Sequence, residues 1–171
     1  MSYIRKKSQA QEKRTAKEFR GRAQIASGAI ENLKGDVRTG KRNTIGFNEN
    51  DFLIENKFTD NDTYKLEKKT WEKIVKEALR DNMRIPLMQI DIQDLQLVVL
   101  DINDYATLFD EEFHMYTGRS HNESFPLKKV DLEKAGDRDV FNLLFSSNVG
   151  VYKQLDLVIM RKETFLDNVR Q

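Results

Sequence analysis

Three acidic residues and one lysine within the first 57 residues of this 171-residue chain are the side chains best suited to chemistry. Glu55 and Lys57 are separated by one residue, Asp36 precedes Glu55 by 19 positions, and Glu12 lies further upstream. Magnesium prefers oxygen ligands and accepts one or two carboxylates beside its own waters. A bound divalent ion neutralises a phosphate and lowers the pKa of a bound water. These residue types therefore suit metal-assisted hydrolysis of a phosphodiester.

The Glu-x-Lys triplet is a weak signal when it stands alone. With 13 Glu and 17 Lys in the chain, about one such triplet is expected by chance on uniform composition. A second one is present at Glu67-Lys68-Lys69. For Glu55 and Lys57 the alternative interpretation is an exposed ion pair on a strand. Only this triplet has an apolar strand around it and an acid in a glycine turn upstream.

The elements that must position these residues can be predicted from hydrophobic periodicity. A helix is expected over residues 8–19, where Glu12, Ala16 and Phe19 share one face. Residues 21–50 are rich in glycine and small polar residues, which favours turns and short strands. The alternation in residues 51–59 predicts a strand with Glu55 and Lys57 side by side on one face.

Further along, residues 66–80 predict an amphipathic helix. Its expected buried residues are Trp71, Ile74, Val75, Ala78 and Leu79. The apolar segments 85–91 and 95–102 predict two strands of a hairpin within a sheet.

The pattern becomes less clear beyond Asp104. Residues 115–138 are polar and favour loops, and residues 140–145 and 155–160 suit either a helix or a strand. Residues 95–100 (LQLVVL) resemble residues 155–160 (LDLVIM), and an aromatic residue follows each of them. Strand segments share such patterns by chance, so this similarity alone does not indicate a repeat.

Composition excludes several classes of protein. The chain has no cysteine and only two histidines, which excludes disulfides and zinc–thiolate sites and disfavours a Ser-His-Asp triad. It has no apolar run long enough to span a membrane. Residues 1–42 carry 12 basic residues against four acidic ones, and a basic segment of this kind is typical of a phosphate-binding surface. We expect a soluble cytoplasmic protein without a membrane partner; the alternative for the first residues is a solvated tail without a partner.

Several ordered motifs carry a resemblance to a known family. They are QAQEKR with Glu12, the turn Ser27-Gly28-Ala29, Gly35-Asp36-Val37, the strand FLIENK, a helix with Trp71, and the apolar segments PLMQIDIQ and LQLVVLDI. In these motifs the stretch from Ser8 to about Tyr105 resembles the archaeal-type Holliday junction resolvases, and more closely their phage-encoded relatives. These enzymes belong to the PD-(D/E)xK nuclease superfamily. Gly35 replaces the proline that usually precedes the first acid.

The resemblance implies an α/β, restriction-endonuclease-like fold with a central mixed sheet flanked by helices. It implies Mg²⁺ as cofactor, with Mn²⁺ able to substitute, held by Asp36 and Glu55. Lys57 would assist catalysis, Glu12 would complete the site with Glu18 as the alternative, and Ser27 would lie near the scissile phosphate. For Ser27 the alternative is a residue of a tight turn only. The nuclease core would span residues 1–105, with residues 106–171 as a C-terminal extension of unknown role.

The function implied is that of a Mg²⁺-dependent, structure-selective endonuclease acting on branched double-stranded DNA, foremost a Holliday junction resolvase. Paired cuts require two active sites, so we expect a homodimer; for a phage-encoded protein the location would be the host cytoplasm. Two alternatives stay open: a catalytically silent DNA-binding or assembly protein on this fold, and a nuclease with a different DNA substrate. The basic residues expected to contact DNA are Arg14, Arg22, Lys34, Lys41, Arg42 and Lys69.

Removing residues 1–7 should weaken DNA binding and flatten its dependence on salt. Each lysine or arginine that neutralises a phosphate releases counterions and adds to the salt slope. The measurement is the affinity of the shortened and full chains for a branched DNA at several salt concentrations. An unchanged slope would show that these residues make no phosphate contact.

Overall fold

The computed structural model describes most of the chain. The described residues are 3–20, 22–23, 36–39, 51–81, 83–109, 121–134, 140–146 and 154–169. Among the predicted functional residues, Ser27, Lys34, Lys41 and Arg42 lie outside these ranges, and the side chain of Arg22 is also not described. No helix of the described part is long and apolar enough to cross a membrane.

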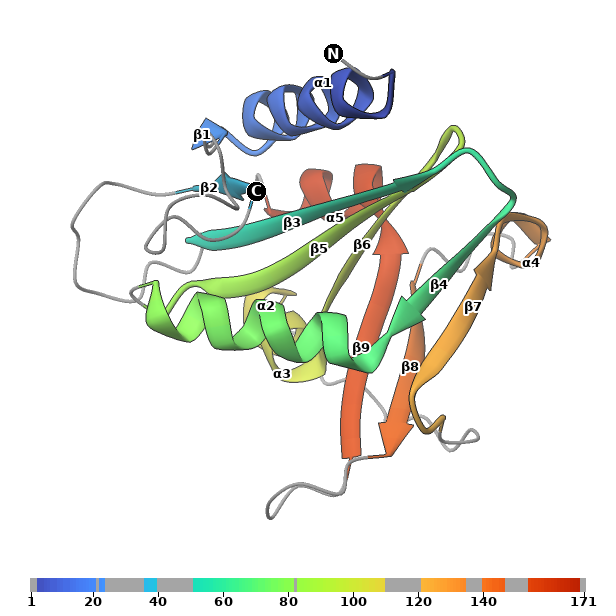
Figure 1. Ribbon diagram of the computed structural model, residues 1–171. Helices are drawn as coiled ribbons and strands as arrows, with labels where there is room; N and C mark the ends of the chain where they lie inside the picture. Colours follow the sequence, from blue (N-terminus) through green and yellow to red (C-terminus); the bar gives the residue numbers. More distant parts are fainter. Residues whose placement is uncertain are drawn as a thin grey trace. The chain divides into compact units, whose positions relative to one another are not determined.

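The described residues form helices and strands in a mixed order along the chain (Figure 1). The strands are β1 (Arg22–Ala23), β2 (Val37–Arg38), β3 (Phe52–Thr59), β4 (Thr63–Glu67), β5 (Ile85–Ile92), β6 (Leu95–Asp101), β7 (Ser124–Lys128), β8 (Val140–Ser146) and β9 (Gln154–Arg161). The helices are α1 (Tyr3–Glu18), α2 (Lys68–Arg80), α3 (Ile102–Phe109), α4 (Lys129–Lys134) and α5 (Lys162–Val169).

Within the described residues the main sheet has seven strands in the order β1-β2-β3-β5-β6-β9-β8, and β4 and β7 form a separate two-stranded sheet. β2 runs antiparallel to β3, and β9 runs antiparallel to both β6 and β8. β3 and β5 are parallel, because Ile85 donates to the carbonyl of Asp51 at their start and Gln93 donates to that of Thr59 at their end. The predicted α/β fold with a central mixed sheet is confirmed.

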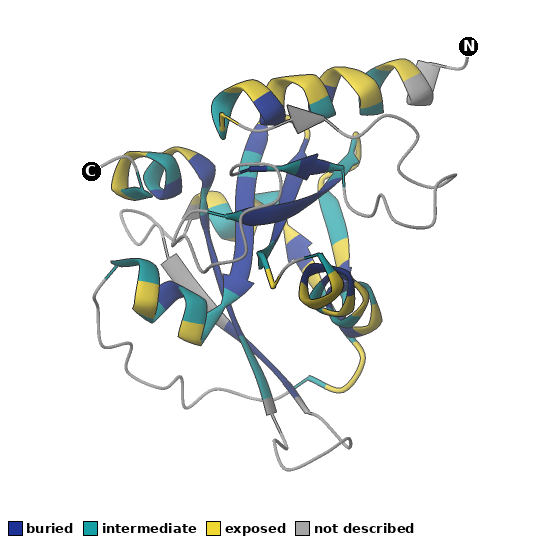
Figure 2. Ribbon diagram, turned by 90° about the vertical axis from the view of Figure 1, so that its left-hand side faces the viewer, coloured by how far each residue is buried: buried dark blue, intermediate teal, exposed yellow. Residues whose placement is uncertain are grey.

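The chain divides into two compact units, of which the first consists of Met1–Lys57 and Lys73–Gln89. Within this unit α1 and the last turns of α2 lie on opposite sides of β3 and β5 (Figures 1 and 2). The strands are largely buried, and α1 has a buried side and an exposed side (Figure 2). The ring of Phe19 packs edge-on against Phe52, with their centroids 6.4 Å apart.

The second unit consists of Phe58–Glu72 and Ile90–Gln171. β6 and β9 pair over residues Leu97–Asp101 and Leu157–Arg161, and apart from the charged last residue of each segment these residues are apolar and buried. α3 follows β6 directly and α5 follows β9 directly. The ring of Phe109 contacts Tyr105 and Phe165, at centroid distances of 4.7 Å and 5.8 Å. β8 and β9 belong to residues 106–171, so this segment supplies strands of the main sheet.

Most predicted elements occur within a few residues of their expected bounds, but two predictions were wrong. Leu79 was placed in the buried stripe of α2 and is 58% exposed. Residues 115–138 were expected to be loops, yet they contain β7 and α4. β4 was also missed, because its sequence TYKLE is short and polar and takes its conformation from pairing with β7.

Replacing Leu66 of β4 by alanine should lower the free energy of unfolding by about 2–5 kcal/mol, the usual cost of emptying a buried leucine site. Leu66 is fully buried. Trp71, which is the chain's only tryptophan and is also buried, reports unfolding by its fluorescence in urea. Lys65→Ala is the control, since Lys65 is exposed on the same strand. Equal stability of the two variants would contradict the assigned burial.

Candidate functional site

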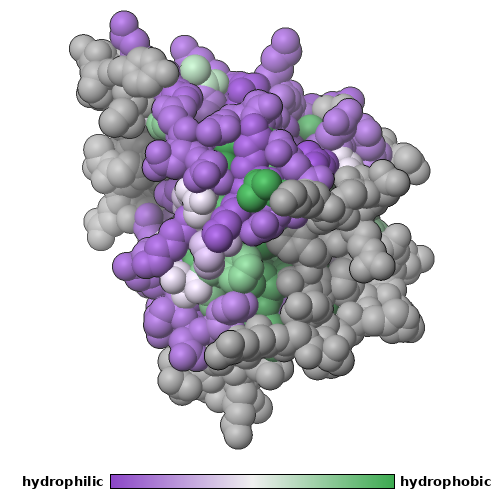
Figure 3. Space-filling view, turned by 90° about the vertical axis from the view of Figure 1, so that its right-hand side faces the viewer, coloured by the Kyte–Doolittle hydropathy of each residue, from purple (hydrophilic) through white to green (hydrophobic). Residues whose placement is uncertain are grey.

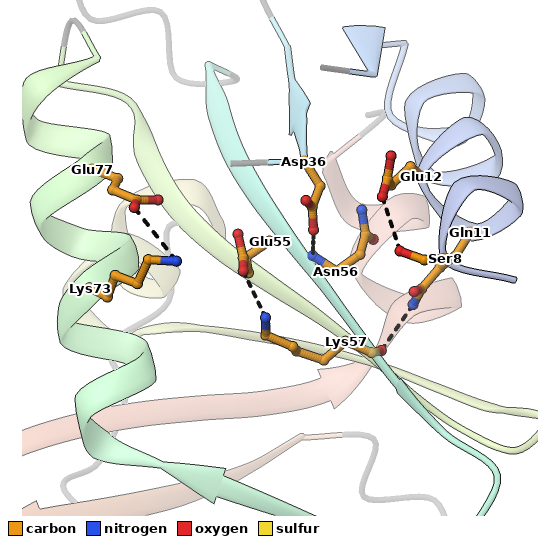
Figure 4. Close-up of polar contacts among 9 residues, drawn as sticks. All are labelled: Ser8, Gln11, Glu12, Asp36, Glu55, Asn56, Lys57, Lys73 and Glu77. Atoms are coloured by element: carbon orange, nitrogen blue, oxygen red, sulfur yellow. Dashed lines mark hydrogen bonds and ion pairs between the residues drawn. The ribbon is translucent and has the colours of Figure 1, made fainter. Parts of the chain in front are cut away.

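Asp36 is brought beside β3 by the pairing of β2 with that strand. Val37 lies opposite Ile54, and the backbone N–H of Asp36 donates to the carbonyl of Ile54 at 2.9 Å. The carboxylate oxygen Oδ2 of Asp36 accepts a hydrogen bond of 2.7 Å from the backbone N–H of Asn56. Two segments separated along the chain therefore place Asp36 next to the Glu55–Lys57 segment (Figure 4).

Glu55 and Lys57 project from the same side of β3, as their spacing predicted. The Nζ of Lys57 donates to Oε1 of Glu55 at 2.7 Å. Glu55 is only 8% exposed, and the side chain of Lys57 is 32% exposed. This arrangement differs from an exposed surface ion pair, because the carboxylate is nearly buried and has a second carboxylate, Asp36, as its neighbour.

The electrostatic environment of Asp36 disfavours its charged form. Burial, which is the strongest cause, and the negative charges of Glu55 and Glu12 together raise the pKa of Asp36 to about 6. The hydrogen bond from Asn56 and the charge of Lys57 act in the opposite direction. A carboxylate destabilised by burial and by other carboxylates is stabilised when a cation binds beside it.

The donor set of this cluster fits a hard divalent cation such as Mg²⁺. Asp36 and Glu55 offer carboxylate oxygens, and Mg²⁺ needs only one or two such ligands because it keeps several waters. Among the described residues no group of three or more histidine, aspartate or glutamate side chains is placed to hold a metal together. The pair would therefore bind Mg²⁺ with much of its coordination left to water and substrate.

Polar contacts anchor α1 to the other side of β3. The side-chain amide of Gln11 donates to the carbonyl of Lys57 at 2.9 Å. The hydroxyl of Thr15 lies 2.9 Å from Oδ1 of Asn56 and 2.9 Å from Oε1 of Gln89 on β5. Thr15, Asn56 and Gln89 are buried, so this network fixes the register of the helix on the strand. Sequence reasoning missed it, because single polar residues in apolar segments carry no periodic signal.

Glu12 lies on α1, on the Asn56 side of β3. Its Oε1 accepts a hydrogen bond of 3.1 Å from the hydroxyl of Ser8 (Figure 4). Glu12 still acts on the site through its charge, which raises the pKa of Asp36. The structure thus gives Glu12 an electrostatic link to Asp36.

α2 contributes a carboxylate that the sequence did not single out. Glu77 is only 8% exposed and pairs with Lys73 at 3.7 Å. In Figure 4 this pair lies on the side of β3 from which Glu55 and Lys57 project. The sequence feature that could have identified Glu77 as buried is its helical spacing, because it lies three residues after buried Ile74 and next to Ala78.

Lys69, the residue of this helix expected near the site, belongs to the second unit. Its side chain is 76% exposed and pairs with Glu67 at 3.3 Å.

An ion-pair cluster ties β2 to the end of α2 in the first unit. Asp81 pairs with Arg38 at 2.8 Å and with Arg84 at 2.9 Å. The Nε of Arg84 also donates to the carbonyl of Thr39 at 3.3 Å. Because Arg38 and Thr39 follow Asp36 closely, these contacts restrain the strand that carries the acid.

The outer side of α1 carries basic residues. The exposed ones are Lys6, Lys13, Arg14, Lys17 and Arg20. Arg14 is thus the predicted DNA contact that the structure places on an exposed surface of the first unit. The spacing of Lys13 and Lys17 places both on one helix face.

Comparisons with known proteins found a structural similarity. The chain is similar to Hjc, a Holliday junction resolvase from the archaeal hyperthermophile Archaeoglobus fulgidus, with 12% identity and a TM-score of 0.41. The match covers 70% of this chain and 86% of that chain. No protein-family model and no curated protein matches the sequence.

Replacing Asp36 by asparagine should stabilise the metal-free protein at pH 7.5 by on the order of 1–3 kcal/mol. A pKa raised from 3.8 to about 6 means that the folded state binds the proton more tightly than the unfolded chain. The wild-type free energy of unfolding therefore falls as the pH rises from about 4 to about 6, by about 1.4 kcal/mol per pH unit before solvent screening.

The measurement is urea unfolding of both proteins in a chelating buffer at pH 7.5 and at pH 4. The difference in free energy of unfolding between Asp36→Asn and the wild type should disappear near pH 4, where wild-type Asp36 is protonated in the folded state. Glu67→Gln, at a partly exposed carboxylate outside the site, serves as control. A variant less stable than the wild type at pH 7.5 would show that Asp36 holds the fold together through its charge.

Proposed function

We propose that this chain is a Mg²⁺-dependent, structure-selective DNA endonuclease acting on branched double-stranded DNA, foremost a Holliday junction resolvase. The observation that carries the proposal is the convergence of Asp36, Glu55 and Lys57 at one point of β3. Two neighbouring carboxylates, one with a pKa raised to about 6, together with a lysine, are what a metal-assisted hydrolase needs.

In this proposal Asp36 and Glu55 hold the metal. When bound, Mg²⁺ or Mn²⁺ would supply an activated water and neutralise the scissile phosphate. Lys57 orients Glu55 through their ion pair, and its ammonium group would stabilise charge that develops on the phosphate. Glu12 is proposed to tune Asp36 through its charge, and Ser27 to contact the phosphate.

Selectivity for branched DNA would come from contacts with the sugar–phosphate backbone and from DNA shape. The exposed basic side of α1 suits such contacts, and Arg14 belongs to it. Arg22, Lys34, Lys41, Arg42 and Lys69 are proposed as further phosphate contacts.

Cutting both strands of a four-way junction needs two active sites. Each chain offers one Asp36–Glu55–Lys57 cluster, so two chains are proposed to act on each junction. The sequence-based expectation is a stable homodimer, and the alternative is two chains bound separately.

The experiment that tests the function uses labelled four-way junction, linear duplex and single strand, each with Mg²⁺, with Mn²⁺ and with a chelator. The proposal expects metal-dependent nicks in the junction and little cleavage of the linear forms. Junction binding without cleavage under either metal would favour a catalytically silent DNA-binding protein. Equal cleavage of all forms would favour a nuclease with another substrate.

Asp36→Asn and Glu55→Gln should each lower junction cleavage at least about 100-fold, because removing groups that stabilise transition-state charge costs this much or more. Binding measured in Ca²⁺ should change little. The control is Glu67→Gln, which alters the chain's other Glu-x-Lys triplet. Parallel loss of binding and cleavage would instead point to a role in folding or in DNA contact.

Lys57→Ala should lower the cleavage rate by about 100- to 1,000-fold with little change in DNA affinity, since its ammonium group acts on charge that develops during the reaction. Single-turnover rates at saturating protein separate this effect from binding. Lys128→Ala, at an exposed lysine of the second unit, is the control. Wild-type rates for Lys57→Ala would remove this residue from the mechanism.

A further inference from the structure

Two segments of the chain correspond residue by residue at a separation of 61 positions. Residues 61–73 read NDTYKLEKKTWEK, and residues 122–134 read NESFPLKKVDLEK. Each segment forms a five-residue strand followed directly by a helix, β4 then α2 and β7 then α4. The two helices begin at corresponding lysines, Lys68 and Lys129.

The correspondence continues in the next elements. β6 is followed by α3 and β9 by α5, and both helices have eight residues. The strands share the pattern LQLVVL and LDLVIM, now at a separation of 60 positions. Tyr105 and Phe165 occupy the same place in the two helices, and both are buried. The similarity that looked like chance in the sequence coincides with the same order of elements.

The pairing between the two segments is symmetric. In β4–β7 the central residue Lys65 lies opposite its own counterpart, Pro126. In β6–β9 Val99 lies opposite its counterpart, Ile159. An antiparallel ladder in which a residue faces its own equivalent has a two-fold axis at that point. The strand order of the main sheet agrees with this relation, because β5 lies beside β6 and β8 lies beside β9.

Single contacts repeat in the same way. The backbone N–H of Lys68 donates to the carbonyl of Glu123 at 2.9 Å, and that of Lys129 donates to the carbonyl of Asp62 at 2.8 Å. Exchanging each residue with its counterpart turns one hydrogen bond into the other. The ion pairs Lys68–Glu72, at 3.9 Å, and Lys129–Glu133, at 3.6 Å, are equivalent too.

We propose that residues 121–169 are a diverged second copy of residues 60–109 that takes, within one chain, the place of a second subunit. A surface that pairs with its own equivalent about a two-fold axis is the geometry of a symmetric dimer interface. Here both partners of each ladder belong to one chain, so the edge of β4 that pairs with β7 and the edge of β6 that pairs with β9 are already occupied. The chain is a pseudo-dimer that functions as a single polypeptide.

Glu55 and Lys57 lie just before the first copy, and the sequence just before the second copy does not repeat them. At 61 positions after Glu55 and Lys57 the sequence has Tyr116 and Gly118, which supply neither a carboxylate nor a lysine. In the described part of the chain the pseudo-dimer therefore carries one such site, formed by Asp36, Glu55 and Lys57. If the proposed nuclease function holds, on which this step rests, one chain cuts one strand per binding event, and paired cuts are made by two independent chains.

Cysteine cross-linking tests the pseudo-dimer without relying on activity. The chain has no native cysteine. Lys65 and Pro126 are exposed and directly opposite one another in β4–β7. Figure 3 shows the right-hand side of Figure 1, where this pair of strands lies, and the described residues drawn there are mainly hydrophilic. Lys65 and Pro126 suit substitution because both are exposed.

Oxidised Lys65→Cys/Pro126→Cys protein should form an intrachain disulfide, which blocks alkylation of both thiols and leaves a single chain on a non-reducing gel. Lys65→Cys and Pro126→Cys alone are the matched controls and should stay single chains. A disulfide-linked dimer of Lys65→Cys that forms as fast as the intrachain disulfide of the double variant would mean that β4 pairs with β4 of another copy and would overturn the proposal. Free, alkylated thiols in the double variant would also overturn it.

Light scattering of the wild-type protein should give the mass of one chain, 20.1 kDa. A mass of two chains would show that one chain is not the complete assembly in solution and would overturn the proposal. These two measurements stand even if the chain is no nuclease.

Mixing wild-type protein with Asp36→Asn protein tests the functional step. At constant total protein in excess over junction, the nicking rate should fall in proportion to the wild-type fraction. A fall with the square of that fraction would show that two sites act together and would overturn single-chain action. An absence of nicking by the wild type itself would count against the proposed function and would leave the cross-linking result intact.

Discussion

The first unit is organised around the electrostatic cost of holding two carboxylates next to each other. Asp36 lies beside Glu55 at the point where β2 meets β3, and the pKa of Asp36 rises to about 6 through burial and the neighbouring charges. The hydrogen bond from the backbone of Asn56 and the ion pair of Lys57 with Glu55 offset part of this cost. Under the proposed function, such a site would give up stability of the metal-free protein in exchange for affinity toward a cation.

The surrounding contacts restrain both strands of the site against this repulsion. The cluster of Arg38, Asp81 and Arg84 ties β2 to the end of α2. Thr15 and Gln11 hold α1 on the side of β3 opposite Glu55. As residues 55–57 alternate between the two sides, one strand presents Glu55 and Lys57 to one side while Asn56 anchors a helix on the other.

The second unit follows a different principle, the pairing of two similar halves about a pseudo-two-fold axis. Each half provides a pairing partner for a strand of the other half. β4 is a short polar strand, and it forms its backbone hydrogen bonds by pairing with β7. A duplicated half needs to keep only the residues that serve packing and pairing. Leu66 and Leu127, which occupy equivalent positions in the two halves, are both fully buried.

The sequence by itself determined the elements with strong periodicity and the chemistry of the candidate site. The alternation in residues 51–59 predicted β3 and placed Glu55 with Lys57, because side-chain direction in a strand follows spacing alone. Only the tertiary structure decided what depends on contacts between distant segments. It paired Asp36 with Asn56, buried Glu77 while exposing Leu79, placed Glu12 on the Asn56 side of β3, and revealed β4 and β7 as symmetric partners. Local sequence does not predict these contacts and exposures, because the free energy that favours them comes from burial and hydrogen bonds between residues far apart along the chain.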